Sequence, residues 1–548
     1  MKPFEIGLTL TGSVSAGAYT AGVIDFLLEA LDAWERQKAL NRANFGDNYS
    51  KWDVPWHDVM ITGLSGASGG GVTCGLMLNF LGRKLDPVAA PPLTSAVNND
   101  LYAIWVQELG IGQLSDITDL QSGNIKSLLN GDALPDIAGR TLTVNNFGNT
   151  LSRGYIAENL RATVTVSNLR GIPYWLRTKG IGATQVIYYK NTDYVKFELA
   201  RNNTAVYPDT TLIPYNTAAA TFKSGYQQLH DACLATCAFP AAFRVQPITQ
   251  NESVYKSRGY VGELAIPAGS DYSFVCGDGG ILNTDPFELL HQDMVPEGHL
   301  QNPRSGATVE RSIIIVAPLD TDSVYSAQYD IGQDSLLETL PSVIGAIRND
   351  AMFSDEQIGL ALEEDVYSRY IIAPVRNDPV TDQPVTPSIT GTAVGTFGAF
   401  LSEDFRAHDY FLGRRNAQQF FKSSFAIPLK EIVQNPIFIP LDIENNQARF
   451  RDFIFTEDGI AYFCILPLCG APAQALYNPP WPAGKYNAQQ IQDDLAKRAG
   501  RLIDIVLSDI KLNWLLKILK FFALNKLKST LVDFIMGKIT RNLGDNHL

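Results

Sequence analysis

The sequence contains little cysteine and fewer basic than acidic residues. Six cysteines among 548 residues are too few and too scattered for a disulfide framework, and no histidine stands at metal-ligand spacing from the two close pairs. We therefore expect buried free thiols in a reducing compartment, and no metal or other cofactor. The charge balance, 44 basic against 57 acidic residues, gives a net charge of −13. Nucleic acid is thus disfavoured as the main partner, because phosphate binding requires a clustered basic field.

Long apolar runs are also missing. The longest apolar stretches are interrupted too early to span a bilayer; 459–473, for example, lacks charge but is too short and contains Pro467 and Pro472. At the N-terminus, residues 4–10 alternate apolar and other side chains with the period of a strand, unlike an export signal. We expect a soluble, cytoplasmic protein.

The first 80 residues show two strand–turn–helix units in tandem. A strand over 4–10 leads into a glycine-containing loop, 12–17, and then into a helix with apolar residues at helical spacing. A second apolar run ends at Gly63 and is followed by a Ser/Gly cluster and a buried helix over 72–81. This order predicts an α/β fold with a mostly parallel central sheet.

The distribution of prolines, other turn-forming residues and strand-like runs along the remaining chain indicates its domain organisation. Residues 86–154 are irregular and rich in turn formers, as in an insertion or a lid, and strand-like runs then continue to about residue 375. Three prolines make 376–396 the best linker candidate, and the chain beyond it is mainly helical. We expect one domain over 1–375 with an insertion at about 86–154, a linker at 376–396, and a helical C-terminal extension over 397–548.

The strongest chemical signal is the segment Gly66-Ala67-Ser68-Gly69-Gly70. It fits the G-x-S-x-G elbow, in which a nucleophilic serine sits on a sharp turn between a strand and a helix. Small flanking residues are needed because this turn is strained and the backbone passes close to the substrate. The alternative is a glycine-rich turn that only packs a helix on the sheet.

Two further glycine-containing segments are candidates for the same site. Backbone amides of Gly12–Gly17 suit an oxyanion, since this loop follows the first strand on the same edge of the sheet as the serine turn. A phosphate-binding loop is less favoured, because neither G-x-G-x-x-G nor a Walker lysine is present. In Cys276-Gly277-Asp278-Gly279-Gly280, the aspartate is either a turn residue or the base that a serine nucleophile requires.

These three segments, in this order, resemble the patatin-like phospholipases. The resemblance extends to Val164–Gly171 and Ala235–Phe243, which are similar to the family's "T-x-L-x-x-G" and "A-S-x-A-x-P-x-x-F" segments, and covers about residues 4–320. It implies a three-layer α/β/α fold and hydrolysis of carboxylic esters of phospholipids by a Ser–Asp dyad. Ser68 would be acylated, Asp278 would act as the base, and Gly66, Gly69 and Gly70 would shape the elbow.

The first loop departs from the family pattern. The family usually has Gly-Gly-Gly-x-Arg-Gly there, whereas this chain retains only the outer glycines and has Ala16 at the arginine position. From the resemblance we still expect an oxyanion hole formed by the amides of Gly12, Ser13 and Val14. The departure leaves a non-enzymatic alternative, a catalytically weakened lipid-binding or scaffold protein.

Histidines keep a second enzymatic alternative open. An α/β-hydrolase has an acid and then a histidine after its serine, and His291, His299 and His408 all follow Asp278. A Ser-His-Asp esterase is therefore compatible with the order of residues, although His291 and His408 stand on expected structural helices.

The C-terminal segment 511–541 is basic, although the chain as a whole is acidic. It has seven basic residues and one acidic residue, interleaved with aromatic and aliphatic side chains. Helices at membrane interfaces have this composition, but the basic residues do not all share one face. We expect either a helical hairpin packed on its own domain or a peripheral membrane contact.

Overall fold

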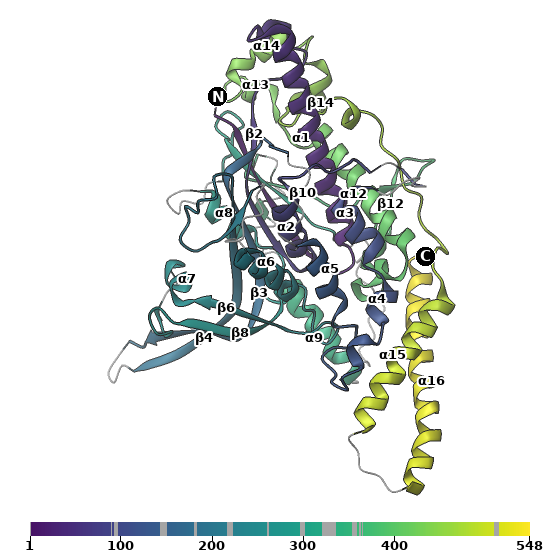
Figure 1. Ribbon diagram of the computed structural model, residues 1–548. Helices are drawn as coiled ribbons and strands as arrows, with labels where there is room; N and C mark the ends of the chain where they lie inside the picture. Colours follow the sequence, from purple (N-terminus) through teal and green to yellow (C-terminus); the bar gives the residue numbers. More distant parts are fainter. Residues whose placement is uncertain are drawn as a thin grey trace.

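A computed structural model describes residues 2–88, 90–91, 97–142, 151–179, 184–215, 223–259, 262–295, 302–319, 336–352, 359–360, 363, 365–508 and 514–548. Within these residues the chain forms a large mixed sheet with helices on both faces (Figure 1).

The central sheet is mostly parallel. In the described part of the chain its main path runs β10-β9-β1-β2-β3-β4-β5. Neighbours from β10 to β3 are parallel, whereas β3 and β4 pair antiparallel as a long ribbon. The strands of this path are β1 (Phe4–Ser13), β2 (Val59–Ala67), β3 (Ile156–Arg177), β4 (Gln185–Ala200), β5 (Thr211–Pro214), β9 (Arg311–Val316) and β10 (Arg369–Ile372).

Side chains that alternate along the strands contact helices on opposite faces. On β9, Ile313 and Ile315 pack against helix α8 (Phe287–Met294), whereas Ile314 and Val316 belong to the core on the other face. That second core contains α1 (Gly17–Phe45), α2 (Ser68–Phe80) and α12 (Glu403–Ser423). The arrangement confirms the predicted α/β class with a mostly parallel sheet.

A short antiparallel branch brings a distant segment to the centre of the sheet. Strand β8 (Asp271–Asp278) pairs with β3 through Val166 and Asp278, and also with β6 (Gln246–Asn251). Nearby lie β7 (Glu263–Leu264), α6 (Lys223–Thr236), α7 (Glu252–Ser257) and η5 (Gly279–Ile281). Because β8 ends at Asp278 beside β3, this residue lies near the carboxyl end of the parallel strands.

The segment predicted as an insertion folds into short helices. Within 86–154 the structure describes α3 (Asp100–Tyr102), η2 (Ala103–Glu108), α4 (Ile111–Ser115), η3 (Thr118–Leu120) and α5 (Ala133–Thr141). Residues 92–96 and 143–150 lie outside the described residues.

The C-terminal part of the chain shares the core of the N-terminal part. Helix α12 lies along α1 (Figure 1), and side chains of both belong to one buried cluster. The segment predicted as a linker is partly buried: the amides of Thr390 and Gly391 donate to the Asp409 carboxylate of α12 at 2.8 Å each. The predicted domain boundaries stay a prediction, but these contacts join both sides of the linker.

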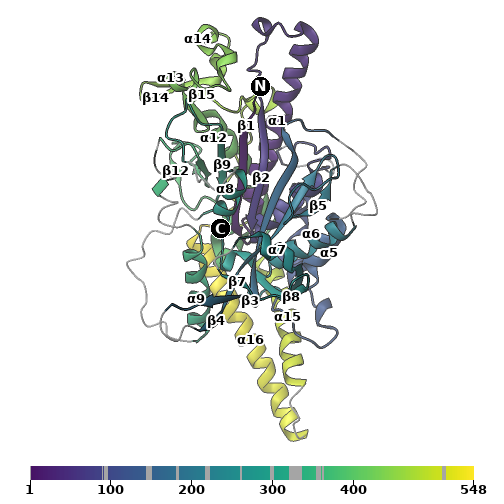
Figure 2. The same ribbon diagram turned by 90° about the vertical axis from the view of Figure 1, so that its left-hand side faces the viewer.

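Further elements complete this part of the chain. A three-stranded sheet contains β13 (Ala426–Pro428), β14 (Ile454–Glu457) and β15 (Ile460–Cys464). The last helices, α15 (Ala488–Ser508) and α16 (Trp514–Asp545), form a hairpin that extends from the body in both views (Figures 1 and 2). Further α-helices among the described residues are α9 (Leu336–Asp350), α11 (Ala393–Thr396), α13 (Leu429–Ile432) and α14 (Ile443–Asn446).

Two glycines allow α1 and α12 to approach closely. A Cβ atom at Gly413 would collide with the Tyr19 carbonyl oxygen, and one at Gly22 would collide with the Tyr410 carbonyl oxygen. Backbone atoms cannot move aside as a flexible side chain can, so both positions require glycine.

Gly413→Ala is expected to lower the free energy of unfolding by roughly 1–3 kcal/mol, because the added methyl group separates the two helices. The matched control is Gly139→Ala on α5, where a Cβ atom meets nothing within 4 Å. Urea denaturation of the two variants measures the difference, and equal stability of both would contradict the close approach.

Candidate active site

Ser68 occupies a strained turn between β2 and α2. Its φ is 51°, in the left-handed region that non-glycine residues seldom adopt, and its side chain is buried. Cβ atoms at Gly69 and Gly70 would collide with the carbonyl oxygens of Ser13 and Leu10 on β1. The turn therefore has the geometry expected of a nucleophile elbow, and its glycines are required by the neighbouring strand.

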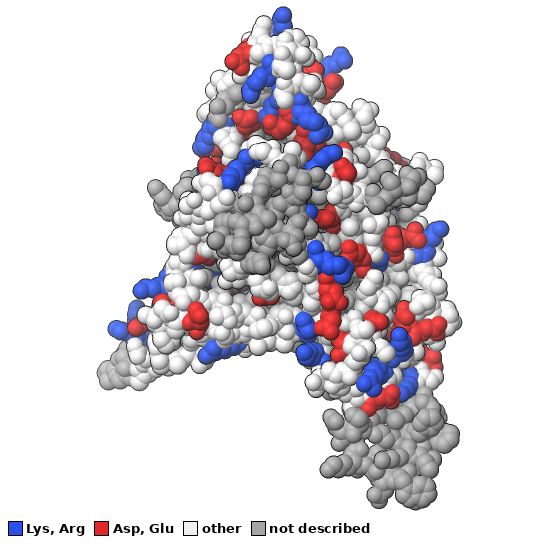
Figure 3. All heavy atoms as spheres, in the orientation of Figure 1, with Lys and Arg blue, Asp and Glu red and all other residues white. Residues whose placement is uncertain are grey.

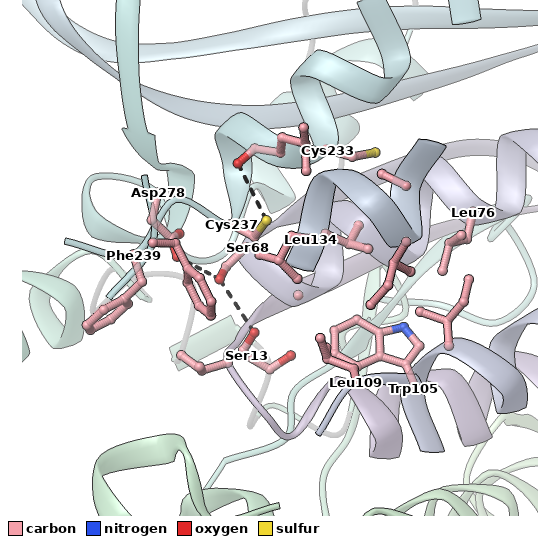
Figure 4. Close-up of a pocket in the computed structure, with 18 of the residues that line it drawn as sticks. Ser13, Ser68, Leu76, Trp105, Leu109, Leu134, Cys233, Cys237, Phe239 and Asp278 are labelled. Carbon is pink, nitrogen blue, oxygen red and sulfur yellow. Dashed lines mark hydrogen bonds between the residues drawn. The ribbon is translucent and has the colours of Figure 1, made fainter. Parts of the chain in front are cut away.

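Asp278 is the hydrogen-bond partner of Ser68. The Ser68 hydroxyl donates to Oδ2 of Asp278 at 2.8 Å, and the Gly280 amide donates to Oδ1 at 2.7 Å (Figure 4). Burial raises the pKa of Asp278 from 3.8 to about 6, against the lowering effect of these two hydrogen bonds and of the Arg348 charge. A carboxylate with this pKa is a better proton acceptor near neutral pH than an exposed aspartate.

Three residues that the sequence did not single out support the pair. Thr236 Oγ1 accepts a hydrogen bond from the Ser68 amide at 2.8 Å and thereby fixes the strained backbone of the turn. From α9, the Arg348 guanidinium donates to the Gly12 carbonyl at 2.9 Å. Thr284 connects that helix to the site, because its hydroxyl donates to the carbonyls of Gly280 and Arg348.

The Gly12 amide, predicted to form part of an oxyanion hole, has a partner within the protein, and its role in an oxyanion hole stays a prediction. That amide donates to the Thr284 carbonyl at 2.9 Å, so it is already engaged. Ser13 lies beside Ser68 through an isolated parallel β-bridge, and Val14 lines the same pocket. The roles of the Ser13 and Val14 amides stay a prediction.

The rest of the first loop is tied to the C-terminal part of the chain. The Ser15 hydroxyl donates to the carbonyls of Thr396 (2.8 Å) and Gly391 (3.2 Å) and accepts the Ala399 amide at 3.1 Å. Ala16, at the expected arginine position, packs directly against Gly391, where a Cβ atom would collide with it. The close contact therefore requires glycine at position 391.

A mainly apolar pocket opens at Ser68. Ser13, Ser68 and Asp278 lie at one side of it, as Figure 4 shows. Its walls come from α2, the helices of 86–154, α6 and the segment after it, and include Leu76, Trp105, Leu109, Leu134, Ile137, Leu234, Phe239, Phe243 and Phe400. This lining suits an extended hydrocarbon chain.

The histidine alternative gains no support from the described residues. His291 is buried on α8, and His408 lies on α12 with Nδ1 3.0 Å from an Asp409 oxygen. Neither lines the pocket of Ser68, and His299 falls outside the described residues.

The cysteines are free thiols, five of them buried. Cys237 lines the pocket, but burial raises the pKa of its thiol well above the usual value, so it is not an activated nucleophile.

Only the last part of the predicted membrane-contacting segment has described side chains. There Phe534 is 53% exposed, Lys538 lies over its ring, and Lys528 pairs with Asp504 of α15. Elsewhere on the face shown in Figure 3, basic and acidic side chains are interspersed. Among the described helices, none combines the length and the apolar character needed to cross a membrane.

Comparisons with known proteins find a sequence relative and distantly similar solved structures. No family model matches the chain. An uncharacterized protein, y4iI, from Sinorhizobium fredii is 28% identical over 599 residues, which cover 99% of this chain and 82% of that protein. The crystal structure of VipD from Legionella pneumophila matches with 11% identity and a TM-score of 0.24, over 99% of this chain and 88% of that one. A TM-score this low carries no argument about fold or function.

Asp278→Asn is expected to stabilise the protein at high pH. The folded state raises the pKa of Asp278, so the stability this group contributes is complete below pH 3.8 and is lost as the pH rises through about 6. The variant should therefore gain up to about 3 kcal/mol over wild type at pH 8, and little at pH 4. Denaturant titrations across this range test it; a difference that does not change with pH would contradict the buried charge.

Proposed function

We propose that the protein is a serine hydrolase that cleaves carboxylic ester bonds of lipids, phospholipids among them. The main support is one observation: a buried serine on a strained strand-to-helix turn donates directly to a buried aspartate at the end of an apolar pocket. Helix α2 begins at Ser68, so its positive end favours the anionic intermediate of acyl transfer.

In the proposed mechanism, Asp278 moves one proton in each half-reaction. Oδ2 takes the proton of Ser68 Oγ while Oγ bonds to the ester carbonyl carbon, and the carbonyl π electrons pass to oxygen. Collapse breaks the bond to the leaving alkoxide, which takes the proton from Asp278. A water molecule then gives a proton to Asp278 and attacks the acyl-enzyme, and Ser68 recovers its proton when the fatty acid leaves.

The proposed substrate class follows from the pocket. Its apolar walls would hold the acyl chain, with the ester beside Ser68. We also propose peripheral membrane contact through 511–541, supported in its described part by the exposed ring of Phe534 beside Lys538. A cytoplasmic location remains part of the proposal.

Ser68→Ala and Asp278→Asn should each reduce ester hydrolysis by at least about 10²-fold, because one removes the nucleophile and the other the proton acceptor. Release of fatty acid from phospholipid vesicles and labelling of Ser68 by a fluorophosphonate measure the effect. His291→Ala and His408→Ala are the controls. Loss of labelling in a histidine variant, with labelling retained in Asp278→Asn, would establish the triad instead.

Arg348→Met should shift the acidic limb of the pH–rate profile to higher pH. The positive charge of Arg348 lowers the pKa of Asp278, so its removal raises that pKa and leaves less carboxylate available near pH 6. We expect a several-fold loss of rate at pH 6 and a smaller loss at pH 8. Arg348→Lys preserves the charge and should restore the profile; an unchanged limb in Arg348→Met would contradict the coupling.

The engaged Gly12 amide favours one other candidate, a lipid-binding protein with little turnover. This candidate predicts that wild type binds phospholipid vesicles without releasing fatty acid, and that Ser68 does not react with the fluorophosphonate.

A further inference from the structure

Ser13 is the last residue of β1 and lies directly beside the candidate nucleophile. It bridges to Ser68 in parallel register, and its carbonyl oxygen is 3.4 Å from Ser68 Oγ. Ser13 also lines the apolar pocket, where Figure 4 shows it across from Ser68. Its side chain therefore borders the space that a reacting ester would occupy.

The Ser13 hydroxyl is buried without a hydrogen-bond partner among the described residues; the whole residue is 3% exposed. Three other hydroxyls of this region are engaged: Ser15 bonds to the 391–399 segment, Thr236 to the Ser68 amide and Thr284 to the Gly280 carbonyl. A buried hydroxyl without a partner is unfavourable. An unpartnered hydroxyl at the wall of a pocket points to a hydrogen bond with a bound molecule.

This hydroxyl lies where the site requires a hydrogen-bond donor for an oxyanion. The Gly12 amide is engaged by Thr284, so it is not available to an oxyanion. A Cβ atom at Gly69 would lie 2.7 Å from Ser13 Oγ, so the hydroxyl lies against the backbone at the start of α2. The positive end of that helix and the hydroxyl donor therefore favour negative charge in the same place.

We propose that the Ser13 side chain donates a hydrogen bond to the oxyanion that forms when Ser68 attacks an ester carbonyl. This proposal rests on the proposed hydrolase function, and it assigns the role to the hydroxyl of Ser13 rather than to the amide of Gly12. No proton is transferred: Ser13 keeps its proton and the carbonyl oxygen carries the charge until the intermediate collapses. The same donor serves acylation and deacylation, because both pass through such an oxyanion.

Ser13→Ala tests the role of the hydroxyl, with a short soluble p-nitrophenyl ester as substrate. Loss of one oxyanion donor should lower kcat by roughly 10²-fold with little change in KM, since the bond forms only in the transition state. Pre-steady-state kinetics should show acylation and deacylation slowed alike. Ser13→Thr retains a hydroxyl and should recover much of the rate.

Thr20→Val is the matched control, because Thr20 on α1 also has a buried hydroxyl without a partner among the described residues, but lies outside the pocket. Neither Ser13→Ala nor Thr20→Val should lower the melting temperature, and only Ser13→Ala should slow the reaction. Unchanged kcat in Ser13→Ala, or slowing of one half-reaction alone, would overturn the proposal. If wild type neither turns over the ester nor reacts with a fluorophosphonate at Ser68, the hydrolase function itself fails.

Discussion

The parallel pairing of β1 with β2 is the constraint on which the rest of the site depends. The ladder holds Leu10 opposite Gly66, and beyond it Ser13 bridges to Ser68. This pairing forces the turn after β2 against the backbone of β1, where only glycine fits at the two positions after Ser68. The strained backbone of Ser68 is thus maintained by a sheet whose strands are buried on both faces, and the serine needs no stabilising contact from a histidine to keep its place.

The site also concentrates features that oppose stability. A non-glycine residue at positive φ, a buried aspartate and a serine hydroxyl without a partner in the described part of the chain lie around one pocket. Each is unfavourable in the free protein, and each is suited to a reaction in which a proton moves and a negative charge appears. Arg348 moderates the second of these, since it lowers the pKa of Asp278 from a helix that is distant in sequence.

Local patterns predicted the central features because those features are themselves local. At Ser68 and at Asp278 the backbone conformation requires small residues or glycine at a few adjacent positions, which a short sequence motif reveals. The order of strands, turns and helices predicted the parallel sheet. Contacts between residues that are distant in sequence produce no such local motif. Arg348 stands in a helix without a motif, and the Gly12 amide donates to the carbonyl of Thr284, which is distant in sequence. The end of the predicted linker is bonded to Asp409, which the prolines of 376–396 do not reveal.

The contact between α1 and α12 has a consequence for synthesis of the chain. Helix α1 ends at Phe45, and its partner begins at Glu403, about 360 residues later. At ribosomal rates of about 5–20 residues per second, α12 is synthesised roughly 20–70 seconds after α1, and until then the apolar face of α1 has no partner helix to pack against. The lack of this partner favours aggregation of the nascent chain during that interval, and the segment that holds Ser15 has not yet been made. The turn at Ser68 is therefore made about 320 residues before the segment that anchors the loop beside it.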